Sequence, residues 1–271
     1  MKQFILFLAL ALAVALGAGS CADDAMNLSP KDGYGHIRLR GSADVQVETR
    51  ATRAELDLST IGVTAPAPGD FALKLTCPDP EFSKQWPTID AFNAEDELYK
   101  AGVYTAVVSY GSPDEEGTDK PYYYGTQEVT VIATQTATAQ INASIANSLA
   151  EIRTTAAFDQ YFHDAAFTLR TASGNEFAFT PKSGVTAVPV FVKAATKLTV
   201  TGTARRQSQT GEDEGPEVAF AEQALEQTVA RTRHIFTFDA ADAGSATLHI
   251  TLDENEEITV SVDVELNENA E

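Results

Sequence analysis

The feature that most constrains the fold is the stretch 98–148, where runs of alternating apolar and polar residues follow one another. The run 103–110 (VYTAVVSY) is rich in β-branched and aromatic residues, and 127–133 and 136–145 alternate in the same way. This pattern is typical of half-buried β-strands. The segment 111–120 carries glycine, proline and acidic residues, so we expect it to form a loop that stays in water.

Similar short runs, separated by turn residues, continue along the rest of the chain. Residues 78–97 look long and irregular, 156–162 favour a helical turn or two, and 219–231 contain helix formers although the surrounding pattern favours a strand. Strands at this spacing predict an all-β chain with two tandem antiparallel Greek-key β-sandwich domains, at 34–146 and 147–271. The strands expected outside the central stretch are 34–40, 70–76, 149–155, 167–171, 176–180, 185–193, 197–204, 233–239, 246–252 and 257–266.

The first twenty residues resemble a lipoprotein signal peptide. Lys2 precedes an apolar run at 4–16, and the small residues 17–20 lead directly to Cys21. The apolar run is too short for a resident membrane span. Ala18 stands where lipoprotein signals prefer leucine, so ordinary cleavage nearby is the alternative. We expect lipidation of Cys21, a tether at 21–33, and stable anchoring in the outer membrane by several acyl chains.

Three motifs carry a family resemblance. They are G-x-Y-T-x-x-x-x-Y-G at 102–111, P-Y-Y-Y-G-x-Q-E-V-T-V at 121–131 and I-x-A-S-I-A-N-S at 141–148. Together with D-F-A-L at 70–73 and F-D-Q-Y-F-H-D at 158–164, they resemble the DUF4493 family of Bacteroidales surface lipoproteins, which is loosely similar to fimbrillin-like adhesins. The resemblance implies a β architecture at the outer face of the outer membrane, and it brings no active site.

The charge of the chain limits its partners. Lys and Arg total 19 against 39 Asp and Glu, giving a net charge of −20. Nucleic-acid binding needs a basic footprint, and anionic lipid surfaces attract basic rather than acidic segments. We therefore expect no nucleic-acid partner and no peripheral docking on anionic lipid; membrane contact would come through the lipid anchor.

The sequence offers no motif for catalysis or for a cofactor. Its four histidines (His36, His163, His234 and His249) lack the spacing of a zinc site or a catalytic triad. The acidic loops at 211–214 and 253–256 lack the ligand spacing of an EF-hand, although a calcium site assembled from separate loops stays open. Cys77 has the surroundings of a buried apolar residue. We predict a non-enzymatic protein with no cofactor or metal.

Four aromatic residues are candidate ligand contacts: Trp86, Tyr122, Tyr123 and Tyr124. Packing explains them as well, because a tryptophan beside a proline can plug the edge of a core and one face of a strand is normally buried. The predicted function is an adhesion or fimbria-like component of the cell surface with a protein or glycan partner. The alternatives are a glycan-binding lipoprotein of a polysaccharide-uptake system and a hydrolase whose acid or metal cluster assembles only in the fold.

Overall fold

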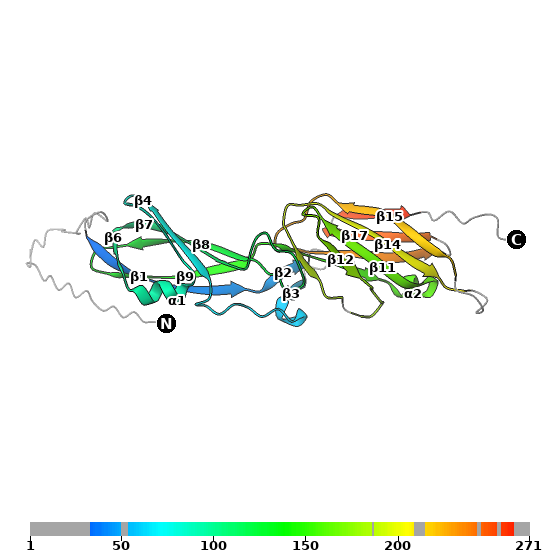
Figure 1. Ribbon diagram of the computed structural model, residues 1–271, viewed down its shortest axis with the longest axis horizontal. Helices are drawn as coiled ribbons and strands as arrows, with labels where there is room; N and C mark the ends of the chain where they lie inside the picture. Colours follow the sequence, from blue (N-terminus) through cyan, green and yellow to red (C-terminus); the bar gives the residue numbers. More distant parts are fainter. Residues whose placement is uncertain are drawn as a thin grey trace, which may run out of the picture.

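The computed structural model describes residues 33–49, 54–185, 187–208, 215–242, 245–253 and 256–262. The chain is mostly β and elongated, with two groups of strands placed end to end (Figure 1). We call residues 33–145 the first unit and residues 148–262 the second unit. Of the helices in these ranges, none is both long and apolar enough to cross a bilayer.

The elements follow the alternating runs of the sequence closely. The helices are short: η1 is a 3₁₀ turn at Leu58–Ile61, α1 spans Ile89–Glu95 and α2 spans Ala156–Tyr161. The strands are β1 (Tyr34–Asp44), β2 (Gln46–Thr49), β3 (Ala54–Asp57), β4 (Ala72–Pro78), β5 (Glu81–Trp86), β6 (Leu98–Lys100), β7 (Gly102–Tyr110), β8 (Tyr123–Val131), β9 (Thr136–Ile145), β10 (Ser148–Thr154), β11 (Phe162–Thr171), β12 (Glu176–Phe179), β13 (Val190–Val192), β14 (Leu198–Arg206), β15 (Glu217–Leu225), β16 (Arg233–Asp242), β17 (Ser245–Asp253) and β18 (Glu256–Val262).

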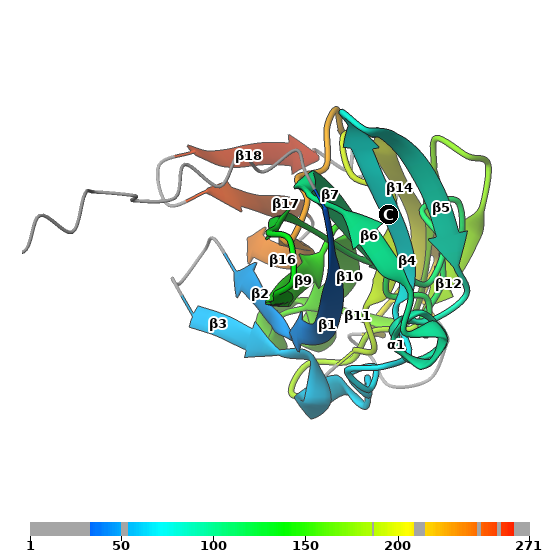
Figure 2. The same ribbon diagram turned by 90° about the vertical axis from the view of Figure 1, so that its left-hand side faces the viewer.

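The first unit consists of a seven-stranded sheet curled around its own core and a small antiparallel sheet of β2 and β3. The strand order of the larger sheet is β5-β4-β7-β8-β9-β1-β6, so β5 and β6 are its two edges. The curl brings these edges together, because Phe82 of β5 and Tyr99 of β6 meet edge to face with ring centroids 5.7 Å apart. Helix α1 lies between the two edge strands along the chain (Figure 2). Its side chains Ile89 and Phe92 are buried. The curl therefore encloses a core that a flat sheet would leave open.

The second unit packs two sheets against each other. One has the order β13-β10-β16-β17-β18 and the other β12-β11-β14-β15. Buried phenylalanines fill the space between them: the rings of Phe167 and Phe238 lie 4.1 Å apart, and Phe158 and Phe220 pack around them. Aromatic pairs of this kind add about 0.5–1.5 kcal/mol each beyond their buried area.

Two parallel pairings were not expected from the sequence. β1 runs parallel to β9, from His36 beside Thr136 to Asp44 beside Ser144, and β10 runs parallel to β16. The prediction of purely antiparallel sheets is therefore wrong. Alternation of side chains is the same in both kinds of pairing, so it identifies a strand without fixing the direction of its neighbour.

The prediction of an irregular segment at 78–97 is also wrong, since β5 and α1 lie there. In β5, Phe82 and Trp86 point inward between polar residues, and Thr88 caps α1 by accepting a hydrogen bond from the N–H of Ala91 at 3.0 Å. The prolines around these elements hid the pattern. The helical turn expected at 156–162 is confirmed by α2. The strand expected at 219–231 is confirmed by β15 as far as Leu225 and is wrong for the rest, and the described residues of 185–193 form only the three-residue β13.

Several expectations fall outside the described residues. These are the signal peptide, Cys21, all but the last residue of the tether, and the acidic loop at 211–214. Cys77 belongs to the described residues and is a buried free cysteine, as expected.

Candidate functional site

The four candidate aromatic residues divide between core and surface. Trp86 is 4% exposed, and its indole N–H donates to Glu95 at 2.7 Å. Tyr123 is fully buried and meets Phe71 edge to face. Tyr122 is half-buried and Tyr124 is 43% exposed, with their rings 6.5 Å apart. Only the pair Tyr122 and Tyr124 can reach a ligand without rearrangement of the core.

Burial also changes the acidity of the core tyrosines. Loss of hydration raises the pKa of Tyr104 and of Tyr123 to about 12, and it raises the pKa of Tyr99 further. The hydroxyl of Tyr104 donates to the carbonyl of Lys100 at 2.9 Å, whereas the hydroxyl of Tyr123 is buried without a hydrogen-bond partner. These rings are structural parts of the first core.

The histidines lie far apart and in separate surroundings. His36 Nδ1 is 3.3 Å from Asp96, His163 Nδ1 is 2.9 Å from Asp164, and buried His234 accepts the N–H of Val229 at 3.0 Å. The side chain of His249 is outside the described part. Within the described ranges, no three His, Cys, Asp or Glu side chains gather in a way that could hold a metal ion.

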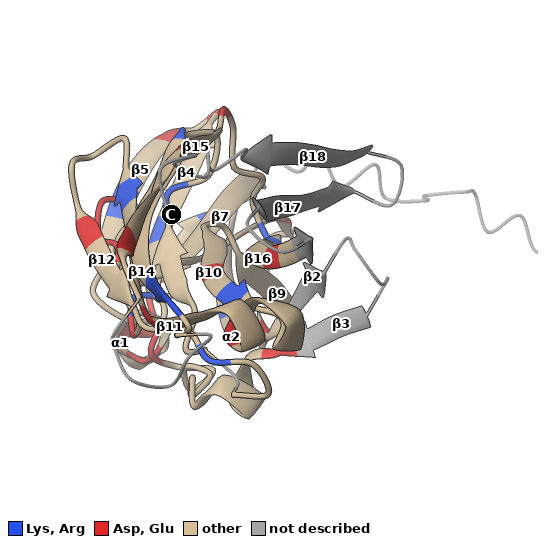
Figure 3. Cartoon of the chain, turned by 90° about the vertical axis from the view of Figure 1, so that its right-hand side faces the viewer, with Lys and Arg blue, Asp and Glu red and all other residues tan. Residues whose placement is uncertain are grey.

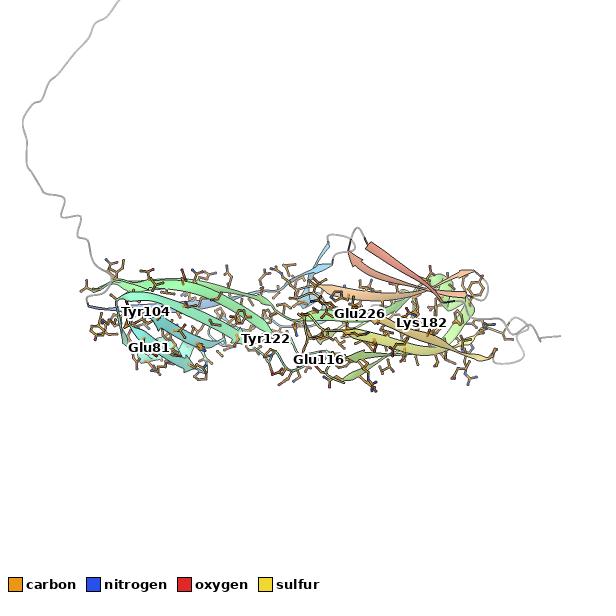
Figure 4. All side chains as sticks on the ribbon, turned by 90° about the horizontal axis from the view of Figure 1, so that it is seen from above. Glu81, Tyr104, Glu116, Tyr122, Lys182 and Glu226 are labelled. Atoms are coloured by element: carbon orange, nitrogen blue, oxygen red, sulfur yellow. The ribbon has the colours of Figure 1, made fainter. Side chains whose placement is uncertain are left out.

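The most elaborate polar contact is the junction between the units, where the loop 111–120 of the first unit meets the second. The carboxylate of Glu116 accepts from Thr171 Oγ1 and Asn175 Nδ2, both at 2.7 Å, and from the backbone N–H of Lys193 at 2.9 Å. Figure 4 places Glu116 at this junction. The expectation that the whole loop stays in water is therefore wrong, because its centre is docked on the neighbouring unit.

Apolar packing crosses the same junction. Leu149 of β10 and Phe191 of β13 are strand neighbours in the second unit, yet both side chains are fully buried in the core of the first unit. The next residues along these strands, Ala150 and Val192, face the second core. At this end of the sheet, β10 and β13 are thus buried on both faces. One face packs in the first core and the other in the second, so this pair of strands joins the two cores.

A third set of contacts at the junction joins Arg231 of the second unit to the end of β1 and the start of β2. Arg231 donates to Asp44 at 2.5 Å and to the backbone carbonyl of Gln46 at 3.0 Å. Asn147, between the units, donates to the carbonyl of Lys120 at 2.8 Å and accepts the N–H of Tyr122 at 3.2 Å. Several hydrogen bonds from separate segments therefore hold the two units together.

A buried charge cluster lies on β10 and β16. The carboxylate of Glu151 is fully buried and pairs with Arg233, whose Nε lies 3.1 Å away, and with Arg153. Arg233 is itself 8% exposed. Charges of both signs occur on both units (Figure 3), and among the residues whose burial the structure describes this is the pair placed inside the protein.

A groove of about 1130 Å³, lined by polar side chains together with Leu39, Pro68, Ile89 and Ala139, runs along β1 on the first unit. One wall carries Arg40 of β1 with Thr138 and Gln140 of β9, and the other carries Asp90 and Asn93 of α1. Asn93 closes the edge of β1, because its side-chain amide accepts the N–H of Leu39 at 3.1 Å and donates to the carbonyl of Leu39 at 2.9 Å. The groove therefore has a hydrogen-bonded floor and exposed polar rims.

Sequence reasoning missed the junction and the groove. Glu116 is one of two adjacent glutamates in an acidic loop, and nothing local separates it from Glu115. Arg40 follows the same outward alternation as Arg38. The hydrogen bonds that set Glu116 apart from Glu115, and Arg38 apart from Arg40, come from segments 55 or more positions away.

Comparison with known proteins gives a family and distant structural likenesses. Residues 33–268 match the family described as "Domain of unknown function (DUF4493)". No curated protein matches the chain. Among solved structures, a candidate polysaccharide-binding protein (DUF1812) of Bacteroides thetaiotaomicron has a TM-score of 0.39 at 11% identity, over 83% of this chain and 100% of that one.

Two further structures come from the same genus. A candidate cell adhesion protein of Bacteroides eggerthii has a TM-score of 0.38 at 8% identity, over 86% of this chain and 96% of that one. A fimbrial protein of Bacteroides ovatus has a TM-score of 0.33 at 7% identity, over 76% of this chain and 48% of that one.

Proposed function

The chain belongs to the DUF4493 family, and from that premise we propose that it is a non-enzymatic surface protein of the outer membrane, built as a rigid stalk that serves adhesion or a fimbria-like assembly. The proposal includes a cleaved lipoprotein signal peptide at 1–20, a lipid anchor at Cys21, and two tandem β domains at 34–146 and 147–271.

The observation that carries this proposal is the docked junction. A stalk must hold its outer end away from the membrane, so its units have to resist bending. Here Glu116, Phe191 and Arg231, which come from three separate segments of the chain, connect the units by hydrogen bonds, packing and an ion pair. β1 begins at one end of the elongated molecule and the second unit forms the other (Figure 1), so an anchor ahead of β1 would leave the second unit pointing outward.

The environment of the histidines and the cysteine favours a structural protein over an enzyme. His36 and His163 each face one exposed aspartate at the surface, and Cys77 is packed in the first core. A catalytic residue needs a partner that activates it beside a space for substrate. The polar groups that converge most strongly, around Glu116, bind the neighbouring unit of the same chain.

Deletion of the gene and anchor substitution test the proposal in cells. The deletion strain should lose adherence or surface filaments, and the wild-type gene should restore them. Cys21→Ser should abolish labelling by a fatty-acid analogue and release the protein from the outer membrane. Unchanged adherence and filaments in the deletion strain, together with no self-assembly of the purified protein, would contradict the proposed function.

Glycan binding in a polysaccharide-uptake system is the second candidate. The neighbouring rings of Tyr122 and Tyr124 favour it, since tyrosine offers a large contact area at low entropic cost. A glycan array would test it, with Tyr124→Ala as the variant and Tyr161→Ala, at a similarly exposed tyrosine in the second unit, as the control. An array without binding would remove this candidate.

A further inference from the structure

The groove along β1 contains a cation without a partner. Arg40 is exposed and makes no hydrogen bond or ion pair with any part of the chain that the structure describes. Its neighbour Arg38 points the same way but is occupied, donating to Asp96 at 2.6 Å and to the carbonyl of Asn93 at 2.5 Å. In a chain with twice as many acidic as basic residues, an arginine left free in a groove is available for an anion.

The side chains beside Arg40 are neutral hydrogen-bonding groups. Gln140 lies directly across from Arg40 on β9, and Thr138 lies one outward position away. Both are exposed and line the groove. An amide and a hydroxyl can each donate and accept, which suits a ligand rich in hydroxyl groups.

The opposite wall supplies an acceptor. The carboxylate of Asp90 is exposed and lies over Gly69, where an added Cβ would come within 2.3 Å of it. It makes no ion pair with any described residue. The groove thus offers a cation on one wall and a carboxylate on the other, which matches a ligand that carries both an anionic group and hydrogen-bond donors.

We propose that this groove binds a carboxylate-bearing oligosaccharide, with Arg40 holding the sugar carboxylate and with Asp90, Thr138 and Gln140 receiving its hydroxyl groups. Arginine suits the carboxylate because its planar fork can donate two parallel hydrogen bonds. A uronic-acid chain combines carboxylates with hydroxyl donors, whereas an acidic peptide offers Asp90 little besides backbone N–H groups. The volume of about 1130 Å³ has room for a short oligosaccharide. This inference rests on the second candidate function, glycan binding, and names its substrate class and site.

Titration calorimetry on the full-length chain tests the site with three probes: tetragalacturonate, a hyaluronan hexasaccharide and an alginate tetrasaccharide. We expect at least one to bind, with affinity that falls as salt rises. Arg40→Gln should weaken binding about tenfold or more, as expected for the loss of a hydrogen bond to a charged group. The affinity of Arg40→Lys should lie between those of the parent chain and Arg40→Gln, because lysine keeps the charge and loses the planar guanidinium that donates two parallel hydrogen bonds. Lys74→Gln, at an exposed lysine of β4 outside the groove, should change nothing.

Several outcomes would overturn the inference. Failure of all three probes to bind would do so, as would equal affinity in Arg40→Gln. Binding of poly-glutamate as tight as that of the sugars would assign the groove to acidic peptides instead. Binding of neutral glycans alone would end this inference and leave glycan binding itself in place. Since Arg40 makes no hydrogen bond or ion pair with the described residues, unchanged thermal unfolding of Arg40→Gln is the control for folding.

Discussion

Phe191 and Gly117 form a two-way backbone bridge between the units, in which the N–H of Phe191 donates to the Gly117 carbonyl at 2.8 Å and the N–H of Gly117 donates to the Phe191 carbonyl at 3.0 Å. The side chain of Phe191 then enters the core of the first unit. A single residue of β13 therefore fixes the loop 111–120 through its backbone and the first core through its ring.

Phe191→Ala should weaken both the fold and the junction. Truncating a fully buried phenylalanine costs about 3–5 kcal/mol of unfolding free energy, because a cavity remains. We expect urea unfolding to shift by that amount and to separate into two transitions as the units lose their shared packing. Phe177→Ala is the control, since Phe177 is half-buried and packs on the second core only. A shift no larger than that of Phe177→Ala would contradict the role given to Phe191.

Glu116→Ala should destabilise the protein by about 1–3 kcal/mol, because it leaves the donors of Thr171, Asn175 and Lys193 without their acceptor. The matched control is Glu226→Ala. Glu226 is 78% exposed and pairs only with Lys197, and exposed ion pairs contribute about 0–1 kcal/mol. Chemical denaturation of both variants would show whether Glu116 acts as a docking residue or as an ordinary surface glutamate.

Most of the strands could be predicted from the sequence, and the junction could not. Alternation is a local signal, so β7, β9 and β11 are visible in it. Leu149 and Phe191 look like core residues, but which of two cores receives them depends on where the units meet. The direction of strand pairing cannot be predicted from the sequence for the same reason. The alternating pattern of the residues that form β1 would be identical beside an antiparallel neighbour.

Tyr123→Phe and Tyr104→Phe should differ although both rings are buried. The Tyr123 hydroxyl has no partner, so its removal should be neutral or stabilising. The Tyr104 hydroxyl donates to Lys100, so its removal should cost about 0.5–1.5 kcal/mol. Thermal unfolding compares the stability of the two variants directly. A larger loss of stability in Tyr123→Phe than in Tyr104→Phe would be inconsistent with the contacts described.

The same tyrosines should make the protein sensitive to alkali. Burial raises the pKa of Tyr104 and Tyr123 from 10.0 to about 12, so between these values the folded state keeps protons that the unfolded state has lost. The stability that comes from these groups is complete below pH 10 and falls as the pH rises toward 12. Urea midpoints across pH 9–12 should decline, and Tyr123→Phe should decline less steeply. A flat profile would show that the tyrosines are accessible to hydroxide in the folded state.

Removing one partner of the buried pair Glu151 and Arg233 should lower the unfolding free energy strongly, whereas replacing both by apolar residues should lower it much less. Arg233→Met leaves the buried carboxylate with Arg153 alone and should cost about 3–5 kcal/mol. Adding Glu151→Leu removes the stranded charge and should recover much of that loss. A double-mutant cycle by denaturation measures the coupling. A double variant less stable than Arg233→Met would show that the charge pair itself stabilises the fold.

The central claim is that the two units form one stiff body, and a distance distribution across the junction tests it most directly. Spin labels at Thr130 in the first unit and Glu226 in the second would be exposed. Replacing Cys21 by serine and buried Cys77 by alanine leaves only the two introduced cysteines. Pulsed dipolar spectroscopy should give a single narrow distribution for the parent chain and a broader one for Glu116→Ala combined with Phe191→Ala. A broad distribution in the parent chain would mean that the units move independently, and the proposal of a rigid stalk would fall.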